Sequence, residues 1–440
     1  MKRAVAPIDR TPLNPLELKG GELLVSNLSA SARTQLAARG FEIGGTRNFA
    51  TVGALLTSIT LPAGMTTTEA RAFLRDAAPD SSIAVNHRYR LYNPSSDDDG
   101  SASAAMESAR ETGGCTSERC YGANVIGWKA HLAKCAQGVR VGVIDTGIDM
   151  THPALKRHRM YLGKIGPANH AASSEMHGTG VLALLAGDMK SSTPGLIPSA
   201  TFYIADIFFP DEHGRPVSTT MHLLAALDWM AQLDVQIINL SLSGPRDGLV
   251  QNVISKMSRP RKSADGKLQI GAVFVAAAGN GGPGAPPSYP AAYSDVVAVT
   301  AVSKDLRSYR RANQGDYIDV AAPGVDIWTA LPEGRQGFQS GTSFATPYMT
   351  AVVAALYKGL PAATNKEELL QRISVQDLGA PGRDRIYGRG LLRAPTSCEA
   401  SPSPQPHTVA APWVTTHTSA AAPQAHSDLW VVNVARSPAH

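Results

Sequence analysis

Two stretches of the chain are apolar, rich in Val and Ala, and lead to a polar residue. Residues 139–145 end at Asp145, and residues 272–279 lead into Asn280 in a glycine-rich loop. Such nearly uncharged runs predict strands buried on both faces in a parallel sheet. Ligand sites in open α/β sheets gather beyond the carboxyl ends of the strands, where Asp145 and Asn280 would lie. Read alone, Asp145 could equally cap the next turn, and Asn280 with Gly281 is a turn signal.

Two other stretches predict apolar helices that begin beside a polar residue. His177 stands where a small-residue turn runs into the apolar residues 181–186. Ser343 precedes a run of Ala, Val and Leu with Pro347 near its front, where a helix tolerates proline. Ser343 is then in the first turn, where unpaired N–H groups and the helix dipole would stabilise a developing oxyanion. The alternatives are a structural or exposed histidine and a serine that only caps the helix.

The N-terminal part of the chain has its own succession of short elements. In chain order they are a strand at 22–26, a helix at 29–39, strands at 41–45 and 54–61, a helix at 66–77 and a strand at 82–92. Thr66 and Glu69 have the spacing of a capping box at the head of the second helix. The order βαββαβ is that of the ferredoxin-like split motif, and an unrelated small α+β domain is the alternative.

Segments of biased composition separate the predicted domains. Residues 93–114 are small, polar and locally acidic, and residues 399–440 are rich in Pro, Ala, Ser, Thr and His. Such segments bury too little apolar surface to fold, so we expect a linker and a disordered tail. Residues 1–19 are then an N-terminal extension, and residues 20–92 and 115–398 are the two folded domains.

The composition narrows the class of protein. With 440 residues, of which 43% are hydrophobic, the chain can build a full-sized core. The net charge of +5 comes without a Lys/Arg block, which argues against nucleic-acid binding. No apolar run approaches the roughly 18 residues needed to span a bilayer. We expect a monomer that neither binds nucleic acid nor spans a membrane.

Asp145, His177 and Ser343 occur in that order along the chain, within a series of short motifs. The further motifs lie at Asn239–Gly244, Ser288–Ala291, Val320–Gly324 and Tyr387–Leu391. From about Tyr121 to Ala394 the chain therefore resembles the subtilisin-like serine proteases, the subtilase family. The order Asp, His, Ser is the one known from subtilisin itself.

The resemblance implies a fold, an activity and a role for each residue. The fold is expected to be a three-layer α/β/α arrangement around a mostly parallel sheet, preceded by a small ferredoxin-like α+β pro-domain. The activity would be hydrolysis of peptide bonds in polypeptides through an acyl-enzyme intermediate. Ser343 would be the nucleophile, His177 its general base and Asp145 the group that orients the imidazolium. Asn280 would complete the oxyanion hole with the Ser343 N–H.

Three positions modify what the resemblance implies. His152 matches a structural position of the family, and we assign it no catalytic role. Gly180 stands where the family usually has a second histidine, which is not a member of the triad. Ser243 stands where glycine is commoner in the strand that pairs with substrate, which should narrow the adjoining pockets.

By the same resemblance, a set of small uncharged residues would contact substrate around the primary specificity pocket. They are Ser241, Leu242, Ser243, Gly244, Ala277, Ala278, Gly279 and Ser288. Because none of them carries a charge, we expect the pocket to accept uncharged side chains.

Residues 20–92 would be a pro-region, because subtilase pro-regions have the ferredoxin-like fold, assist folding of the protease and then inhibit it. We expect an autoprocessed zymogen that is cut between about Tyr92 and Cys115. The pro-region would act as an intramolecular inhibitor.

Cysteine content and the first residues bear on the compartment. Cys115, Cys120, Cys135 and Cys398 permit three pairings and flank the catalytic domain, which suits disulfides in an exported enzyme. They lack the paired spacing of zinc ligands. Residues 1–10 have a basic start but no apolar core of signal-peptide length. We expect a secreted or periplasmic enzyme, with a cytoplasmic protein carrying free thiols as the alternative.

No cofactor is expected to be required, and no metal is expected among the site residues. Structural calcium is left open, because many subtilases bind it. The loop acids here, Asp188, Asp211, Glu212 and Asp247, are expected to face solvent.

The alternatives come from two other classes of function. A catalytically silent subtilase-fold binding protein is the main alternative, and retention of the triad together with Asn280 argues against it. A nucleotide-binding enzyme is disfavoured because no Gly-x-Gly-x-x-Gly follows the strand at 139–145.

Overall fold

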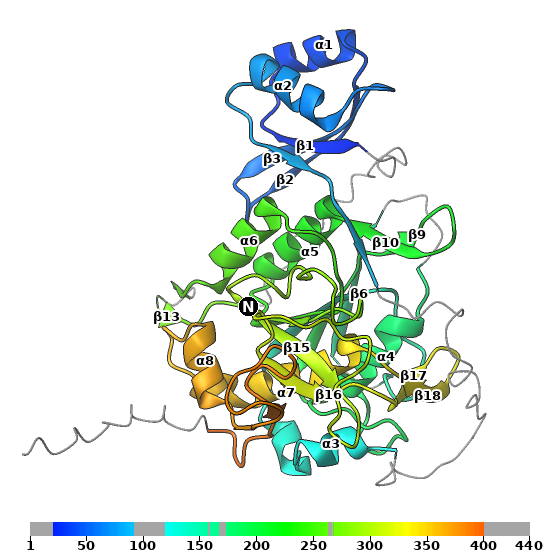
Figure 1. Ribbon diagram of the computed structural model, residues 1–440, viewed down its shortest axis with the longest axis vertical. Helices are drawn as coiled ribbons and strands as arrows, with labels where there is room; N and C mark the ends of the chain where they lie inside the picture. The colour runs from blue at the N-terminus through cyan, green and yellow to red at the C-terminus, as the bar shows by residue number, and fades with distance from the viewer. Residues whose placement is uncertain are drawn as a thin grey trace, which may run out of the picture. The chain divides into compact units, whose positions relative to one another are not determined.

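The computed structural model describes residues 21–91, 119–156, 159–166, 173–262, 266 and 268–399 (Figure 1). The predicted N-terminal extension, the linker and all but the first residue of the predicted tail lie outside these ranges.

The N-terminal part is a four-stranded antiparallel sheet with two helices (Figure 1). Its elements are β1 (Glu22–Ser26), α1 (Ala30–Ala38), β2 (Glu42–Phe49), β3 (Ala54–Thr60), α2 (Thr67–Ala77) and β4 (Ile83–Val85), and its strand order is β2-β3-β1-β4. Successive side chains of β1 point to opposite faces of the small sheet. Leu23 and Val25 pack beneath α1 and α2, and Leu24 packs on the other face. The capping box at Thr66 and Glu69 is present. The predicted small α+β fold is confirmed.

The prediction of one strand at 82–92 is wrong. The small sheet ends with β4, and β5 (Arg88–Arg90) belongs to a different sheet, with β10 (Pro216–Thr219) and β9 (Phe209–Pro210). Between them Asn86 donates its amide to Glu22 Oε2 at 2.8 Å and accepts from the Met221 backbone N–H at 3.1 Å. This buried amide holds the chain where it crosses from one sheet to the other.

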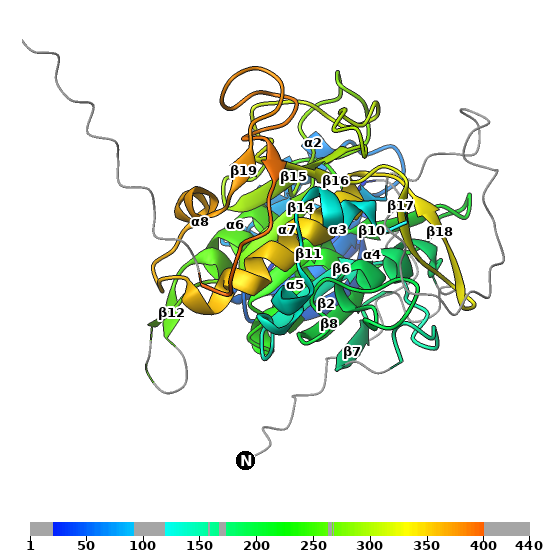
Figure 2. The same cartoon turned by 90° about the horizontal axis from the view of Figure 1, so that it is seen from below.

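The second folded part, which lies within residues 119–399 and is expected to be catalytic, is called the catalytic part. It is built on a nine-stranded sheet (Figures 1 and 2). In sheet order its strands are β19 (Val375–Gln376), β20 (Leu391–Leu392), β16 (Val320–Pro323), β15 (Val296–Val302), β14 (Val273–Ala277), β11 (Ile237–Leu240), β6 (Arg140–Asp145), β8 (Thr201–Asp206) and β7 (Met160–Lys164). Every neighbouring pair is parallel except β19 and β20. The predicted mostly parallel sheet is confirmed.

Helices cover both faces of this sheet. They are α3 (Tyr121–Val125), α4 (Met176–Ala186), α5 (Thr220–Gln232), α6 (Gly248–Ser258), α7 (Thr342–Leu356) and α8 (Lys366–Arg372). Short 3₁₀ segments and two small hairpins complete the part: η2 (Ala130–Lys134), η3 (Tyr357–Gly359), β12 (Arg261–Lys262) with β13 (Leu268–Gln269), and β17 (Ile327–Leu331) with β18 (Arg335–Gln339). Val143 of β6 packs with α4 and α7, whereas its neighbour Ile144 packs with α5 and α6. The layers are therefore α/β/α, as predicted.

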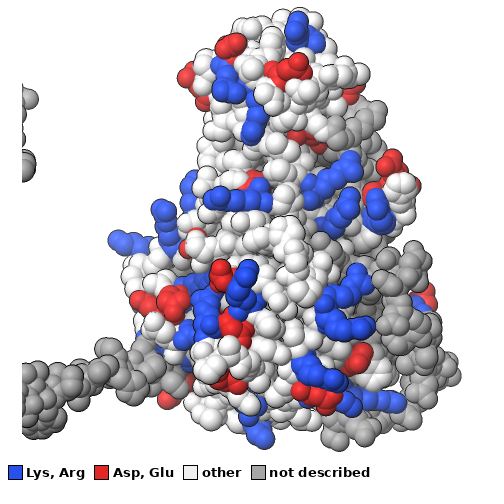
Figure 3. Space-filling model, in the orientation of Figure 1, with Lys and Arg blue, Asp and Glu red and all other residues white. Residues whose placement is uncertain are grey.

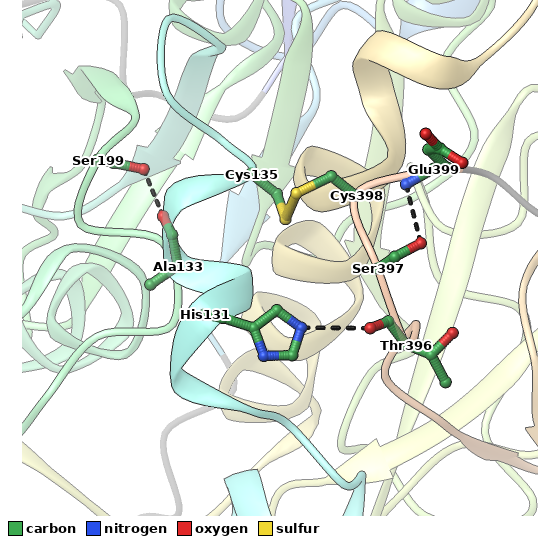
Figure 4. Close-up of a disulfide and its surroundings, with 8 residues drawn as sticks. All are labelled: His131, Ala133, Cys135, Ser199, Thr396, Ser397, Cys398 and Glu399. Carbon is green, nitrogen blue, oxygen red and sulfur yellow. Dashed lines mark hydrogen bonds between the residues drawn. A yellow bond between two sulfur atoms is a disulfide. The ribbon is translucent and has the colours of Figure 1, made fainter.

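A disulfide joins Cys135, just before β6, to Cys398, just after β20 (Figure 4). Their Cα atoms are 5.2 Å apart, and beside them His131 Nε2 contacts the Thr396 carbonyl oxygen at 3.2 Å. Cys120 is also disulfide-bonded, and Cys115 lies outside the described residues. The expected bracing of the ends of the catalytic part is confirmed for the Cys135–Cys398 pair.

In the part of the chain that the structure describes, no helix has the length and apolar character needed to cross a membrane. On the face drawn in Figure 3, acidic and basic side chains are interspersed.

Replacing Cys135 and Cys398 together by serine should lower the free energy of unfolding by about 2–5 kcal/mol. Without the bridge, the unfolded chain gains the conformational freedom that closure of a long loop removes. Denaturant unfolding followed by circular dichroism measures the change. The control substitution Ser31→Ala, at an exposed position, should change the free energy of unfolding by no more than about 0.5 kcal/mol. Equal unfolding free energies for the double variant and the parent would contradict the expectation.

Candidate active site

Asp145 is the last residue of β6 and is fully buried. Its Oδ1 accepts the Thr146 backbone N–H at 2.7 Å and lies 2.7 Å from His177 Nδ1. A carboxylate only accepts hydrogen bonds, so the imidazole presents its Nδ1–H to Asp145 and carries the free lone pair on Nε2. This is the tautomer that a general base needs.

His177 is the second residue of α4 and only 5% exposed. The next residue, Gly178, donates its N–H to Thr146 Oγ1 at 2.9 Å. A Cβ at Gly178 would lie 2.7 Å from the carbonyl oxygens of both Thr146 and Gly147. A glycine is therefore required where the start of α4 meets the turn that follows Asp145.

Ser343 is the second residue of α7 and is 6% exposed. The cap of this helix is Gly341, so the alternative in which Ser343 is itself the cap is wrong. The ring of Phe344 lies 5.3 Å from the His177 ring, between centroids. The first turn of α7 thus lies against the start of α4.

Asn280 follows β14 and is held by the same helix start. Its Oδ1 accepts both the N–H and the Oγ1–H of Thr342, each at 3.0 Å. Its Nδ2 faces the turn before Ser343, because a Cβ at Gly341 would lie 3.1 Å from that nitrogen. The two bonds through Oδ1 leave the amide N–H groups directed toward Gly341 rather than toward the Thr342 side chain.

The residues predicted to contact substrate do not all lie together. Ser243 Oγ hydrogen-bonds to Ser288 Oγ, and a Cβ at Gly279 would lie 3.1 Å from Ser288 Cβ. Gly244 exchanges both backbone hydrogen bonds with Tyr289, at 2.9 and 3.1 Å. These residues form one small uncharged group.

The other predicted contact residues are used inside the protein. Ser241 Oγ accepts from Asn239 Nδ2 at 3.0 Å, and Leu242 packs in the core with α5 and α6. Ala277 ends β14, and Ala278 donates its N–H to the Val299 carbonyl at 3.0 Å. Their side chains are buried, so only their backbone can take part in a contact with substrate.

Strand β5, which was predicted only as the end of a single strand at 82–92, lies beside this group. The Arg90 N–H donates to the Ser243 carbonyl at 2.8 Å, and the Ser243 N–H donates to the Arg90 carbonyl at 3.0 Å. On its other side β5 pairs with β10, with Tyr89 opposite Ser218. Tyr89 is fully buried, and a Cβ at Gly244 would lie 2.5 Å from its ring. The alternation Arg88-Tyr89-Arg90 is that of a strand with one buried side chain, but it does not reveal which sheet the strand joins.

His152 is a buried structural residue. Its Nδ1 accepts the Ala154 N–H at 3.1 Å, and its Nε2 lies 3.0 Å from the Arg335 carbonyl. Burial lowers the pKa of His152, which keeps the ring neutral in this arrangement. These contacts agree with a position that needs no catalytic role.

Two of the four loop acids are bound within the protein. The prediction that Asp247 faces solvent is wrong: it is 2% exposed, caps α6 through the Leu249 N–H at 2.8 Å, and accepts from Thr220 Oγ1 at 2.6 Å. Asp211 pairs with Arg215 at 2.9 Å. Among the described residues, no group of three or more His, Cys, Asp or Glu side chains is arranged to hold a metal ion.

A model of the family described as "Subtilase family" matches residues 136–390. The minor extracellular protease Epr of Bacillus subtilis is 31% identical over 60% of this chain and 39% of its own length. Subtilisin E of Bacillus subtilis is 29% identical over 59% of this chain and 66% of its own length. The major intracellular serine protease of the same species is 31% identical over 50% of this chain and 68% of its own length.

Similarity to a solved structure supports the fold. Fervidolysin from Fervidobacterium pennivorans, described as a keratinolytic enzyme related to subtilisin, has a TM-score of 0.64. It is 20% identical, and the match covers 85% of this chain and 60% of that one.

Replacing Gly341 by alanine should lower the free energy of unfolding by about 1–3 kcal/mol, because its φ of 153° disfavours a side chain and the new Cβ would press on Asn280. Gly248, the exposed first residue of α6, is the matched control, since a Cβ there meets nothing within 4 Å. Alanine at 248 should leave the stability unchanged or slightly raised in urea unfolding. Equal effects of the two alanines would contradict the assigned strain.

Proposed function

Since the chain belongs to the subtilase family, we propose that it is a serine endopeptidase that hydrolyses peptide bonds through an acyl-enzyme. One observation carries the proposal. The buried 2.7 Å hydrogen bond between Asp145 and His177 lies against the helix start that holds Ser343.

In the proposed reaction, Ser343 Oγ attacks the carbonyl carbon of the peptide while His177 Nε2 takes its proton. The tetrahedral intermediate then collapses, the C–N bond breaks, and His177 returns the proton to the leaving amine. Water repeats the sequence on the ester, with His177 again as base. Asp145 orients the ring and stabilises the imidazolium in both halves.

The negative charge of each tetrahedral intermediate falls on the former carbonyl oxygen. We propose that the Ser343 N–H and Asn280 Nδ2 donate to it, since both belong to the cluster around the start of α7. The reaction needs no cofactor in this scheme, because side chains of the chain supply the nucleophile, the base and the oxyanion donors.

Substrates are proposed to be polypeptides that add a strand beside residues 243–244. Ser243, Gly279 and Ser288 lie together and are small and uncharged, which supports a preference for uncharged side chains. The Cys135–Cys398 disulfide supports a location outside the cytoplasm, as a secreted or periplasmic enzyme. The relatives include both an extracellular and an intracellular protease.

Residues 20–92 are proposed to be a pro-region that inhibits the enzyme and is removed by autoprocessing in the linker. The pairing of Arg90 with Ser243 supports this, because β5 lies where a substrate strand would bind. A second contact holds the pro-region on α5, where Asp228 accepts the N–H and Oγ1–H of Thr51 at 2.7 and 2.8 Å.

The proposal is tested by reaction of the purified chain with a fluorophosphonate probe, followed by intact mass. The parent should gain the probe mass and lose the N-terminal region, because its serine is activated and can cut the linker. The Ser343→Ala variant should do neither. A folded parent that has lost residues 20–92 but gains no probe would instead support the silent binding protein.

Replacing Tyr89 by alanine should weaken the pro-region's hold on the catalytic part about a hundredfold, because loss of a fully buried aromatic side chain costs roughly 3 kcal/mol or more. Gel filtration of the processed protein, with both fragments quantified, measures the change. Arg88→Ala is the matched control, since its exposed side chain lies in the same strand. Equal retention of the fragment in both variants would count against β5 as the inhibitory element.

A further inference from the structure

A second buried carboxyl group lies beside Asp145, and the proposed reaction does not use it. Asp206 is the last residue of β8 and is 8% exposed. The parallel pairing of β6 with β8 makes Asp145 and Asp206 direct partners in register. Since paired strands lie about 4.8 Å apart, the two carboxyl-bearing residues are neighbours at the edge of the sheet where His177 lies.

One serine links Asp206 to the turn that follows Asp145. Ser173 Oγ donates to Asp206 Oδ1 at 2.9 Å and accepts the Gly147 N–H at 2.7 Å. The start of α4 binds the same turn, through the hydrogen bond from Gly178 to Thr146. Asp206 and Ser173 therefore support the turn from one side while the helix that carries His177 rests on the other.

The charges around Asp206 are mostly negative. Asp206 and Ser173 line a cavity of about 460 Å³ that also bears Lys164 of β7 and the acids Asp149, Glu175 and Glu333. Burial raises the pKa of Asp206 to about 6, against the opposing effects of its hydrogen bond to Ser173 and of the Lys164 charge, with Asp145 raising it further. The group is thus mainly ionised at neutral pH and adds a negative charge beside the catalytic pair.

We propose that Asp206 is a positioning residue of this active site, which holds the turn carrying Asp145 through Ser173 and stabilises the protonated His177 by its charge. The inference rests on the proposed function, because the effect is exerted on the general base of that reaction.

The two actions have different signatures. Neutral His177 is the active base, so the rate of attack by Ser343 falls when acid protonates the ring. A nearby negative charge stabilises the protonated ring and places this fall at higher pH. Removing the charge of Asp206 therefore moves the acid-side fall in rate to lower pH. Loosening the turn that follows Asp145 instead lowers the rate at every pH.

The experiment measures the second-order rate constant for fluorophosphonate labelling of processed protein across the pH range. Asp206→Asn keeps an Oδ1 acceptor for Ser173 and removes the charge, so the acid-side midpoint should fall by about half a pH unit. Ser173→Ala breaks the hydrogen-bonded link between Asp206 and the turn after Asp145. The plateau of the labelling rate constant should therefore fall roughly tenfold, and the acid-side midpoint should also shift slightly to lower pH. The matched control is Asp234→Asn, which removes an exposed charge before β11, at the opposite end of the strands, and whose φ of 51° suits asparagine. Its profile should equal that of the parent.

The outcomes separate the inference from the function on which it rests. If the folded parent is not labelled at Ser343, the proposed function fails. If the parent is labelled and Asp206→Asn has the parental midpoint, the charge has no effect on His177 and the inference is overturned. Should Asp206→Asn not fold, Ser173→Ala decides, because a parental plateau and midpoint in that variant overturn the inference equally.

Discussion

In a parallel sheet every strand finishes at the same edge, and this alignment governs where Asp145, Asp206, Ser243 and Asn280 lie. β6 and β8 finish at Asp145 and Asp206, β11 leads into the segment that reaches Ser243, and β14 leads to Asn280. The strand pairing brings together groups that are far apart in sequence. Each of these four strands pairs with a neighbour on both sides, so the backbone that leads to this edge is held by ladder hydrogen bonds.

Helix starts add the second half of the site, and they need close approach of backbone to backbone. α4 begins at the turn after Asp145, and only a glycine fits at 178. α7 begins beside Asn280, where Gly341 leaves room for the amide. The proposed site thus depends on two points of close approach, at Gly178 and Gly341, as well as on the three proposed reactive residues.

The N-terminal part is joined to the catalytic part by a shared apolar core as well as by strand pairing. Leu24 and Leu56 from the small sheet pack in the same core as Tyr89 and residues of α5 and α6. Separation of the two parts would therefore expose apolar surface on both, which would oppose dissociation after the proposed cut in the linker.

The main elements were predictable because their apolar runs are long and end at residues with recognisable chemistry. Asp206 ends a run of the same kind, Phe202–Ala205, yet was overlooked because no known motif surrounds it. Asp247 stands directly before an apolar helix, and that capping position, rather than its charge, decides its burial.

The wrong prediction of a single strand at 82–92 has another cause. Its register is set by partners distant in sequence, Ser218 and Ser243, and local alternation does not reveal where one sheet ends and the next begins. The pairing of Cys135 with Cys398 was open for the same reason, since only the folded sheet brings the two ends of the catalytic part together.

That disulfide turns the catalytic part into a covalent ring closed by one sulfur–sulfur bond. A peptidase is exposed to its own activity, and surface loops are where cutting occurs. A single cut anywhere between residues 135 and 398 would open the ring without releasing a fragment, so the two pieces would stay attached and the nine-stranded sheet could persist. The bridge thus protects the molecule against the consequence of a nick rather than against the nick itself.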